Sequence, residues 1–388
     1  MTSIVRIILA AALSALLTAC GTERATGPAM IVSVSPNGHW AVSSHRDGTI
    51  VLWNIAQRSA RVVSNNANIY SAYFVADNRH FLWQGQDGVV HVDKVAGGEQ
   101  NSFKNFPVYG QAMGKHGQLY LAVSQDYGVY AGHGATKKQV KAPGGSFLGY
   151  GKLLNLSLSP DNKRFTTSGF GSPYDAEWES IAEEKRKGYK DLVGVTLWSA
   201  KTLRPTAKLP GNAAKTFATF SPDGKYILSG DEDLTGIVWK THPPRQTMKL
   251  ASLFHGVYIG QGKDLDGLYG TAFAKAAYDK TGLIKPPRDF HGEAILSLRF
   301  IDKRDHYLRF TTYSPYAILY KIDSPLPIKY LPLGKHPFPA VSDYSRNTAI
   351  DTAPAAGILA MGERNGNGII VYHYDDKTET LKKVWVSD

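Results

Sequence analysis

Residues 31–53 read IVSVSPNGHWAVSSHRDGTIVLW. The stretch holds three short runs in which apolar and polar side chains alternate, the pattern of a half-buried β-strand. Two turns separate the runs, Ser35-Pro36-Asn37-Gly38 and Asp47-Gly48. Asn, Asp and Gly tolerate the positive φ angles that tight hairpin turns need. The stretch therefore predicts three consecutive antiparallel strands.

This unit recurs along the chain. Its first turn returns as Ser159-Pro160-Asp161-Asn162 and as Ser221-Pro222-Asp223-Gly224, and a more polar fourth strand follows, for example at Arg61-Val62-Val63. The third strands are expected to begin at Gly48, Gly88, Gly128, Gly194, Gly236, Tyr316 and Gly368. The first three of these positions follow one another at intervals of 40 residues. A period of about 40–45 residues is that of a β-propeller blade.

The third strands end in aromatic residues. Leu52-Trp53-Asn54, Leu197-Trp198-Ser199 and Val238-Trp239-Lys240 stand where the WD40 family has Trp-Asp, and the chain resembles that family over almost all of residues 30–388. The Asp is replaced each time, and the Gly-His dipeptide of the family is missing. The resemblance implies a ring of four-stranded blades that presents loops and a central funnel to partner proteins. The three tryptophans and Tyr320 are expected to pack between blades.

Two segments interrupt the repeat. Residues 170–191 fall between the second and third strands of the fourth repeat, and Ala176–Lys187 is rich in helix formers. Residues 251–290 lie between the fifth and sixth repeats, and their middle, Leu268–Tyr278, also favours a helix. Both are interpreted as insertions that contain a short helix.

The number of blades depends on the second insertion. With both segments set aside, the rest of residues 20–388 provides roughly 44 residues for each of seven blades. Tyr316 follows Gly236 by two periods, so an eighth blade inside residues 251–290 is the alternative. The prediction is an all-β fold, a single β-propeller domain over residues 30–388 with seven four-stranded blades and helical insertions. The last blade is expected to be complete from one stretch of chain.

The N-terminus has the features of an export signal. The apolar stretch Ile7–Leu17 is too short to span a bilayer, which takes about 20 residues, and fits the core of a signal peptide over residues 1–19. Leu17-Thr18-Ala19-Cys20 resembles the lipobox of bacterial lipoproteins, which implies cleavage before Cys20 and a lipid on its thiol. Residues 20–29 are then a tether, and Gly21 implies an outer-membrane protein facing the periplasm. The alternative is an ordinary signal peptide with a chance cysteine.

The composition limits the classes of molecule that are expected to bind this protein. The chain has 44 Lys and Arg against 33 Asp and Glu, a formal charge of +11, and a single cysteine. A basic surface favours anionic partners, but the charges are scattered and no basic run is interleaved with aromatics. Nucleic acid is therefore not expected as a partner. We expect a protein partner in the cell envelope and a membrane contact through the lipid, while the oligomeric state stays open.

The sequence shows no catalytic motif. HExxH, CxxC, GxSxG, the P-loop and GxGxxG are all absent, so we predict no enzyme, no catalytic residue, no metal ligand and no cofactor. Ser146 stands among glycines in residues 144–149 without the spacing of a nucleophile elbow. His91 and His373 are expected to be partly buried packing residues. Residues 264–267 and 231–233 have a faint resemblance to calcium loops and fit solvated turns better.

The sequence is compatible with two functions. The leading one is an interaction scaffold, with Trp178 in the first insertion as the candidate partner-binding residue, because an exposed aromatic can anchor an interface. The alternative for Trp178 is packing of the insertion onto the ring. The rival function is a propeller hydrolase or small-ligand binder that uses the central funnel. It requires at least three acidic or histidine side chains at one mouth of the channel.

Overall fold

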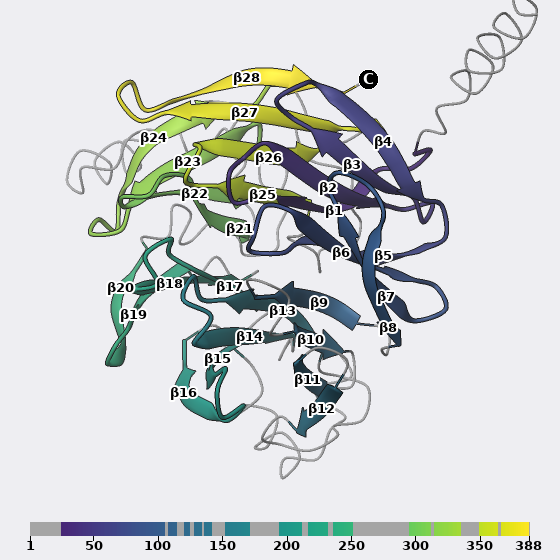
Figure 1. The fold of residues 1–388 in the computed structure, drawn as a ribbon. Coiled ribbons are helices and arrows are strands. Elements are labelled where there is room, and N and C mark those ends of the chain that lie inside the picture. The colour runs from purple at the N-terminus through teal and green to yellow at the C-terminus, as the bar shows by residue number, and fades with distance from the viewer. Residues whose placement is uncertain are drawn as a thin grey trace, which may run out of the picture.

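The computed structural model describes residues 25–104, 108–114, 120–124, 128–133, 136–141, 152–170, 194–211, 216–231, 236–250, 295–311, 314–334, 349–363 and 366–387 (Figure 1). Every regular element in these ranges is a β-strand. No helix among them is long and apolar enough to cross a membrane. The insertions predicted at 170–191 and 251–290 lie outside the described residues, except for Phe170.

The described strands pair into seven four-stranded antiparallel sheets. We number the sheets in chain order. Sheet 1 contains β1 (Ala29–Val34), β2 (Trp40–His45), β3 (Ile50–Asn54) and β4 (Ser59–Ser64). Sheet 2 contains β5 (Ala67–Phe74), β6 (His80–Gly85), β7 (Val89–Lys94) and β8 (Glu99–Lys104). Sheet 3 contains β9 (Val108–Met113), β10 (Tyr120–Ser124), β11 (Gly128–His133) and β12 (Thr136–Lys141).

The remaining sheets follow the same order. Sheet 4 contains β13 (Lys152–Leu158), β14 (Arg164–Phe170), β15 (Gly194–Ser199) and β16 (Pro205–Leu209). Sheet 5 contains β17 (Thr216–Phe220), β18 (Tyr226–Asp231), β19 (Gly236–Thr241) and β20 (Pro244–Lys249). Sheet 6 contains β21 (Ile295–Phe300), β22 (His306–Thr311), β23 (Tyr316–Lys321) and β24 (Pro327–Pro332). Sheet 7 contains β25 (Ile350–Ala353), β26 (Ile358–Gly362), β27 (Ile369–Asp375) and β28 (Thr380–Val386).

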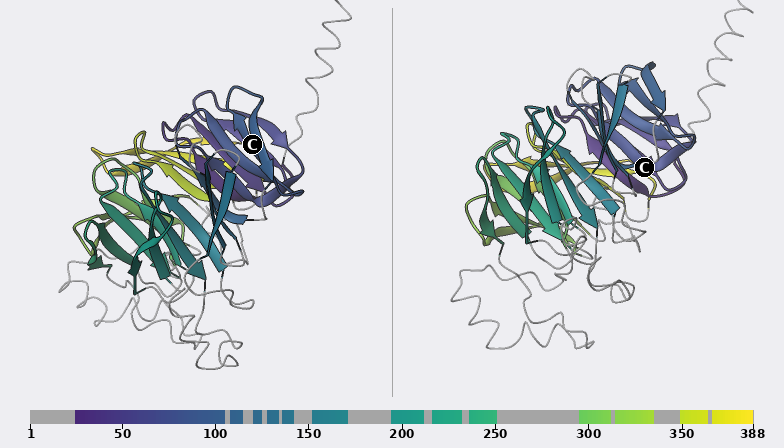
Figure 2. Two further views of the ribbon diagram at one scale, coloured as in Figure 1. Left: turned by 60° about the horizontal axis from the view of Figure 1, so that its bottom comes forward. Right: turned by 90° about the horizontal axis from the view of Figure 1, so that it is seen from below.

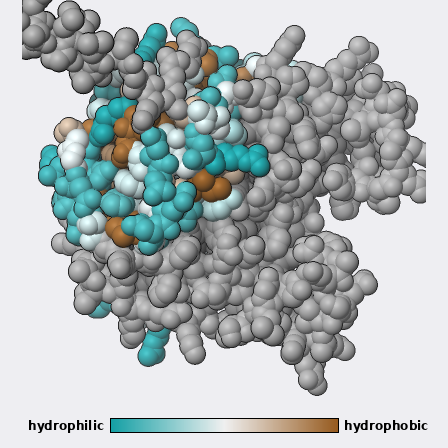
Figure 3. Space-filling view, turned by 90° about the vertical axis from the view of Figure 1, so that its right-hand side faces the viewer, coloured by the Kyte–Doolittle hydropathy of each residue, from teal (hydrophilic) through white to brown (hydrophobic). Residues whose placement is uncertain are grey.

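Consecutive sheets stand side by side around a centre (Figure 2). The first strand of each sheet contacts the first strand of the next, from β1 to β5 and onward through β9, β13, β17, β21 and β25. The fourth strands lie outside: β20 is mostly exposed and β4 contains no buried residue, whereas β3 and β19 are mostly buried. Figure 3 shows a face where hydrophilic residues predominate over the described surface. The predicted polar fourth strands are therefore confirmed.

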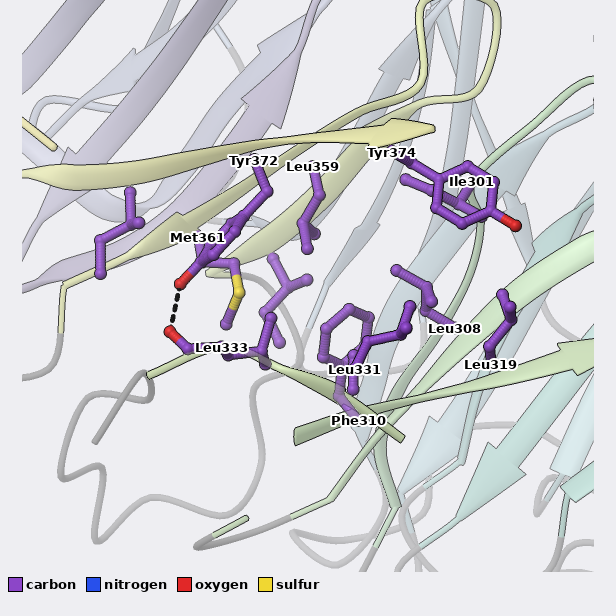
Figure 4. Close-up of a cluster of buried hydrophobic side chains, with 13 residues drawn as sticks. Ile301, Leu308, Phe310, Leu319, Leu331, Leu333, Leu359, Met361, Tyr372 and Tyr374 are labelled. Atoms are coloured by element: carbon purple, nitrogen blue, oxygen red, sulfur yellow. Dashed lines mark hydrogen bonds between the residues drawn. The ribbon is translucent and has the colours of Figure 1, made fainter. Parts of the chain in front are cut away.

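Apolar side chains fill the space between neighbouring sheets. Between sheets 6 and 7, Leu308 and Phe310 of β22 face Leu359 and Met361 of β26 (Figure 4). Tyr372 adds a hydrogen bond from its hydroxyl to the carbonyl of Leu333, at 2.5 Å. Similar clusters join sheets 1 and 2, 4 and 5, and 5 and 6. With one face of each sheet packed on its neighbour, the core is distributed around the ring.

The ring closes by packing of two complete sheets. Sheet 7 comes from one stretch of chain, as predicted, and lies beside sheet 1 (Figure 1). Trp53 of β3 meets Trp385 of β28 edge-on, with ring centroids 5.9 Å apart. The amide of Val34 donates to Asp351 Oδ2 at 2.8 Å. Residues 25–28 are also docked on sheet 1, since Ala25 is buried there and the amide of Arg46 donates to the carbonyl of Pro28.

The turns between first and second strands have a common structure in sheets 1, 4 and 5. Ser221 Oγ donates to Asp223 Oδ1 at 2.6 Å and accepts from the amide of Tyr226 at 2.9 Å, and Ser159 makes the same pair of bonds. Positive φ angles occur where the sequence predicted them, at Gly38 (74°), Asn162 (58°) and Gly224 (71°). The Ser-Pro-Asp/Asn-Gly pattern therefore sets these hairpins by local chemistry.

The tryptophans of the third strands are held by hydroxyl groups of the second strands. Trp53 Nε1 donates to Ser43 at 2.7 Å, and the corresponding bonds join Trp198 to Thr167 at 2.9 Å and Trp239 to Ser229 at 2.8 Å. All three rings are at most 5% exposed. The expected packing role of these residues is confirmed, and sheets 1, 4 and 5 are each braced by this bond although the usual Asp and Gly-His residues are missing.

In sheet 1 the bond between Trp53 and Ser43, which we call the brace of the sheet, is part of a network that reaches the start of the described chain. Ser43 Oγ lies 2.7 Å from His45 Nε2, and His45 Nδ1 lies 2.8 Å from the carbonyl oxygen of Gly27. Burial lowers the pKa of His45, so the imidazole is neutral. In that form Nε2 accepts a hydrogen bond from the hydroxyl of Ser43, and Nδ1–H donates one to the carbonyl of Gly27. The network thereby fixes the chain ahead of β1 to the tryptophan of β3.

The predicted fold class needs two corrections. No helix occurs in the part of the chain that the structure describes, so the helical component of the prediction gains no support. The eight-blade alternative is wrong, because sheets 5 and 6 pack directly on each other: Leu228 and Val238 share one cluster with Leu298 and Ile318. Among the described residues, no sheet stands between sheets 5 and 6. The 80-residue step in the repeat could not distinguish an insertion from an extra blade.

Acid should weaken the attachment of residues 25–28. Asp47 accepts hydrogen bonds from Thr26 and Thr49; partial burial alone would raise its pKa, but these bonds lower it to about 2. This contribution to stability is present above about pH 4 and is lost as the pH falls toward 2. Because Asp47 is exposed, we expect Asp47→Asn to cost only about 1 kcal/mol at pH 7, measured by urea unfolding, and almost nothing at pH 2.

The matched control for this titration is Asp323→Asn, an exposed carboxylate in the turn before β24. It should leave the free energy of unfolding within about 0.5 kcal/mol at both pH values. An equal loss for Asp47→Asn at pH 7 and pH 2 would contradict the assignment.

Candidate functional site: the central channel

Six of the seven first strands place equivalent residues on the channel. Each stands two positions before its turn and lines one cavity of about 150 Å³: Ser33, Tyr73, Ser157, Thr219, Arg299 and Asp351. Asn155 also lines this cavity, and its buried Oδ1 has no hydrogen-bond partner. We call this cavity the throat. Its lining is a polar belt at the centre of an apolar ring, where a ligand can be hydrogen-bonded from several sheets at once.

The throat contains one guanidinium and one carboxylate. Arg299 Nε lies 3.8 Å from Asp351 Oδ1, and the side chains are 12% and 29% exposed. Burial raises the pKa of Asp351 and lowers that of Arg299, while each charge partly offsets the effect on the other. The Arg299 side chain in particular has little contact with solvent. In such surroundings either charge interacts more strongly with a partner than it would in water.

The same positions also tie the sheets together. The amide of Phe74 donates to Ser33 Oγ at 3.1 Å, and the amide of Phe220 donates to Ser157 Oγ at 3.3 Å. Asp351 accepts the amide of Val34 in the same way and so replaces the serine at the junction of sheets 7 and 1. The belt therefore has a structural role, whatever the channel binds.

One end of the throat opens into a wider cavity of about 550 Å³, which we call the mouth. The two cavities share Ser157, Thr219, Arg299 and Asp351. The turns between first and second strands surround the mouth with four prolines: Pro36, Pro160, Pro222 and Pro354. Lys303 and Asp223 add charges of both signs, and the buried rings of Phe220 and Phe300 form part of the wall. An apolar rim over a charged centre is typical of a recognition site.

The structure tests few of the residues singled out in the sequence. Trp178, Cys20 and the lipobox residues Leu17, Thr18 and Ala19 lie outside the described residues, as do residues 144–149 and 264–267. His91 has the expected packing role, since its ring stacks on Trp83 at 4.2 Å. His373 is exposed, so its predicted partial burial is wrong. Asp231 is buried at the end of β18 and is not a solvated turn residue.

One titratable cluster was missed by the sequence analysis. Asp302, Asp305 and His306 bring their side chains together, with His306 Nδ1 2.6 Å from Asp302 Oδ2. Asp302 Oδ1 also accepts the amides of residues 304–306. Asp77 holds its turn and His80 in the same way in sheet 2. The cluster is thus a turn cap that occurs in two sheets, and we assign it no ligand.

Sequence comparison agrees with the repeat. Residues 22–54 and 203–240 match the family described as WD domain, G-beta repeat. The first segment ends one residue beyond Trp53 and the second one residue beyond Trp239, at the third strands of sheets 1 and 5. No protein with a curated description matches the chain. Together with the four-stranded sheets, the two matches support a WD40-like β-propeller. The lipobox is not covered by these matches and stays a prediction.

Proposed function

We propose that this WD40-like β-propeller is a lipid-anchored interaction scaffold whose protein partner binds at the mouth of the channel. The lipid on Cys20 would hold it in the outer membrane of a bacterial cell envelope, facing the periplasm. The observation that carries the proposal is the mouth itself, where prolines from four sheets surround one cavity with a charged centre. Propellers with this repeat bind proteins in general, and the tether would bring the bound partner to the membrane surface.

The chemistry of the mouth favours recognition over hydrolysis. Its described lining contains the carboxylates of Asp223 and Asp351 and no histidine, which is fewer than the three groups that the hydrolase hypothesis requires. Asp351 is engaged by Arg299 and by the amide of Val34. The prolines are already rigid, so little conformational entropy is lost when a partner covers them.

A single crosslinking experiment tests this function. The tagged full-length protein is crosslinked in cell envelopes, purified and analysed by mass spectrometry, alongside Ala355→Arg. Ala355 is exposed at the mouth, so the long cationic side chain should obstruct a partner without unfolding the ring. We expect one abundant partner with the native protein and at least about a tenfold lower yield with the variant, since a contact worth about 1.4 kcal/mol changes affinity tenfold.

Two controls make the result specific. Ala60→Arg places the same side chain on exposed strand β4, far from the channel, and should leave the yield unchanged. Cys20→Ser should lose the lipid, leave the membrane fraction and reduce the yield of a membrane-bound partner. Equal recovery with Ala355→Arg and Ala60→Arg would remove the mouth from the proposal. Recovery of no specific partner would reject the scaffold and leave the small-ligand alternative in the throat.

A further inference from the structure

Arg309 of β22 is a buried cation that has no counter-charge among the described residues. Its exposure is 0%, and Nε, Nη1 and Nη2 have no hydrogen-bond partner. It pairs across the sheet with Leu298 and Ile318, which belong to the cluster between sheets 5 and 6. Directly opposed residues in an antiparallel sheet point to the same face, so the guanidinium lies in that interface. No ion pair among the described residues involves Arg309.

The position explains how the arginine came to be buried. Arg309 occupies the place in β22 that Ser43, Thr167 and Ser229 occupy in their second strands, and Tyr320 occupies the place of the tryptophan. In sheet 6 the Trp–hydroxyl brace is therefore replaced by a guanidinium beside a phenol. Tyr307 stacks on Tyr320 with ring centroids 5.4 Å apart. The charge of Arg309 acts on both tyrosines, and at Tyr320 its side chain also interacts with the phenol as a hydrogen-bond donor, although without full hydrogen-bond geometry.

The two tyrosines do not neutralise the charge of the guanidinium. Burial raises the pKa of Tyr307 and Tyr320, so both phenols keep their protons although the guanidinium draws the values down. Among the described residues the site then presents N–H and O–H donors and neutral phenol oxygens but no anionic group, and an uncompensated buried charge is strongly unfavourable. The hydroxyl of Thr311, two residues along the same face, is a further buried group without a partner.

We propose that the interface between sheets 5 and 6 holds a small monovalent anion, of the size of chloride, bound by Arg309 and the hydroxyls of Tyr307 and Tyr320. The site is enclosed between two packed sheets, which restricts an occupant to a small ion. The anion would complete the brace of sheet 6 by linking β22 to β23, the task that a direct hydrogen bond performs in sheets 1, 4 and 5.

The test is the melting temperature of the full-length protein in sodium chloride and in sodium gluconate at equal ionic strength. Gluconate is too large for the enclosed site. We expect chloride to raise the melting temperature by about 2 °C or more, with a saturable dependence on concentration, because a ligand that binds only the native state stabilises it by mass action. Arg309→Met should abolish the difference between the two salts. Arg304→Met, which alters an exposed cation near β22, should retain it.

A second measurement does not depend on a folded variant. Crystals of the native protein grown in sodium bromide should show an anomalous scattering peak between the guanidinium of Arg309 and the hydroxyls of Tyr307 and Tyr320. A peak there confirms the site even if Arg309→Met does not fold. Identical melting in the two salts together with no bromide at Arg309 would overturn the proposal.

Discussion

Replacing Trp239 by alanine should destabilise the protein by about 3–5 kcal/mol, as measured by urea unfolding at pH 7. The indole is 2% exposed and fills the interface between sheets 4 and 5, where it packs with Ile227 and Ile237. Its removal leaves a cavity that two rigid sheets cannot collapse to fill. A further loss comes from Ser229, whose hydroxyl no longer receives the indole N–H at 2.8 Å.

A double-mutant cycle separates the packing from the hydrogen bond. Ser229→Ala leaves the buried indole N–H without an acceptor and should cost about 1–3 kcal/mol. Trp239→Phe keeps most of the apolar ring, and the combination with Ser229→Ala should cost less than the sum of the two single changes, because both polar partners are then gone. Strict additivity would show that the bond contributes nothing to the brace. A loss below about 1 kcal/mol for Trp239→Ala would contradict the packing role altogether.

The parts of the fold that depend on residues close together in the sequence could be predicted from the sequence. The turns at Gly38, Asn162 and Gly224 follow from residues that tolerate positive φ, and the third strands begin within two residues of the predicted positions. The brace could be predicted only in part. Its tryptophans are visible in the repeat, but their acceptors depend on cross-strand register. In sheet 2 the partners are even exchanged, since Trp83 stands on the second strand and donates to Asp93 on the third.

The throat could not be predicted, because its residues come together only when the ring closes. Arg299 and Asp351 are 52 residues apart and belong to different sheets. Taken singly, each is one polar residue in an alternating strand. A signal was nevertheless present: Ser33, Ser157 and Thr219 each stand two residues before the serine of a turn. Alignment of the repeats on those turns would have placed Arg299 and Asp351 in the same column and marked them as the two charged members of the channel.

The ion pair in the throat leads to the second large effect. Asp351→Ala should destabilise the protein by about 2–4 kcal/mol in the same urea assay. The change removes the acceptor of the Val34 amide at the junction of sheets 7 and 1, and it deprives the poorly solvated Arg299 guanidinium of its carboxylate. Two separate costs are therefore combined in one substitution, and a second variant is needed to distinguish them.

Asp351→Ser distinguishes these costs, because a serine at this position accepts the amide of the next sheet, as Ser33 and Ser157 do. The single change should restore the tie between sheets and retain only the cost of the unbalanced charge. The combination with Arg299→Met removes that charge as well and should bring the free energy of unfolding back to within about 1 kcal/mol of the native value, since a buried ion pair replaced by neutral residues is often close to neutral. If the double variant is as unstable as Asp351→Ala, then closure of the ring depends on the charge itself and not on the hydrogen bond that the serines make elsewhere.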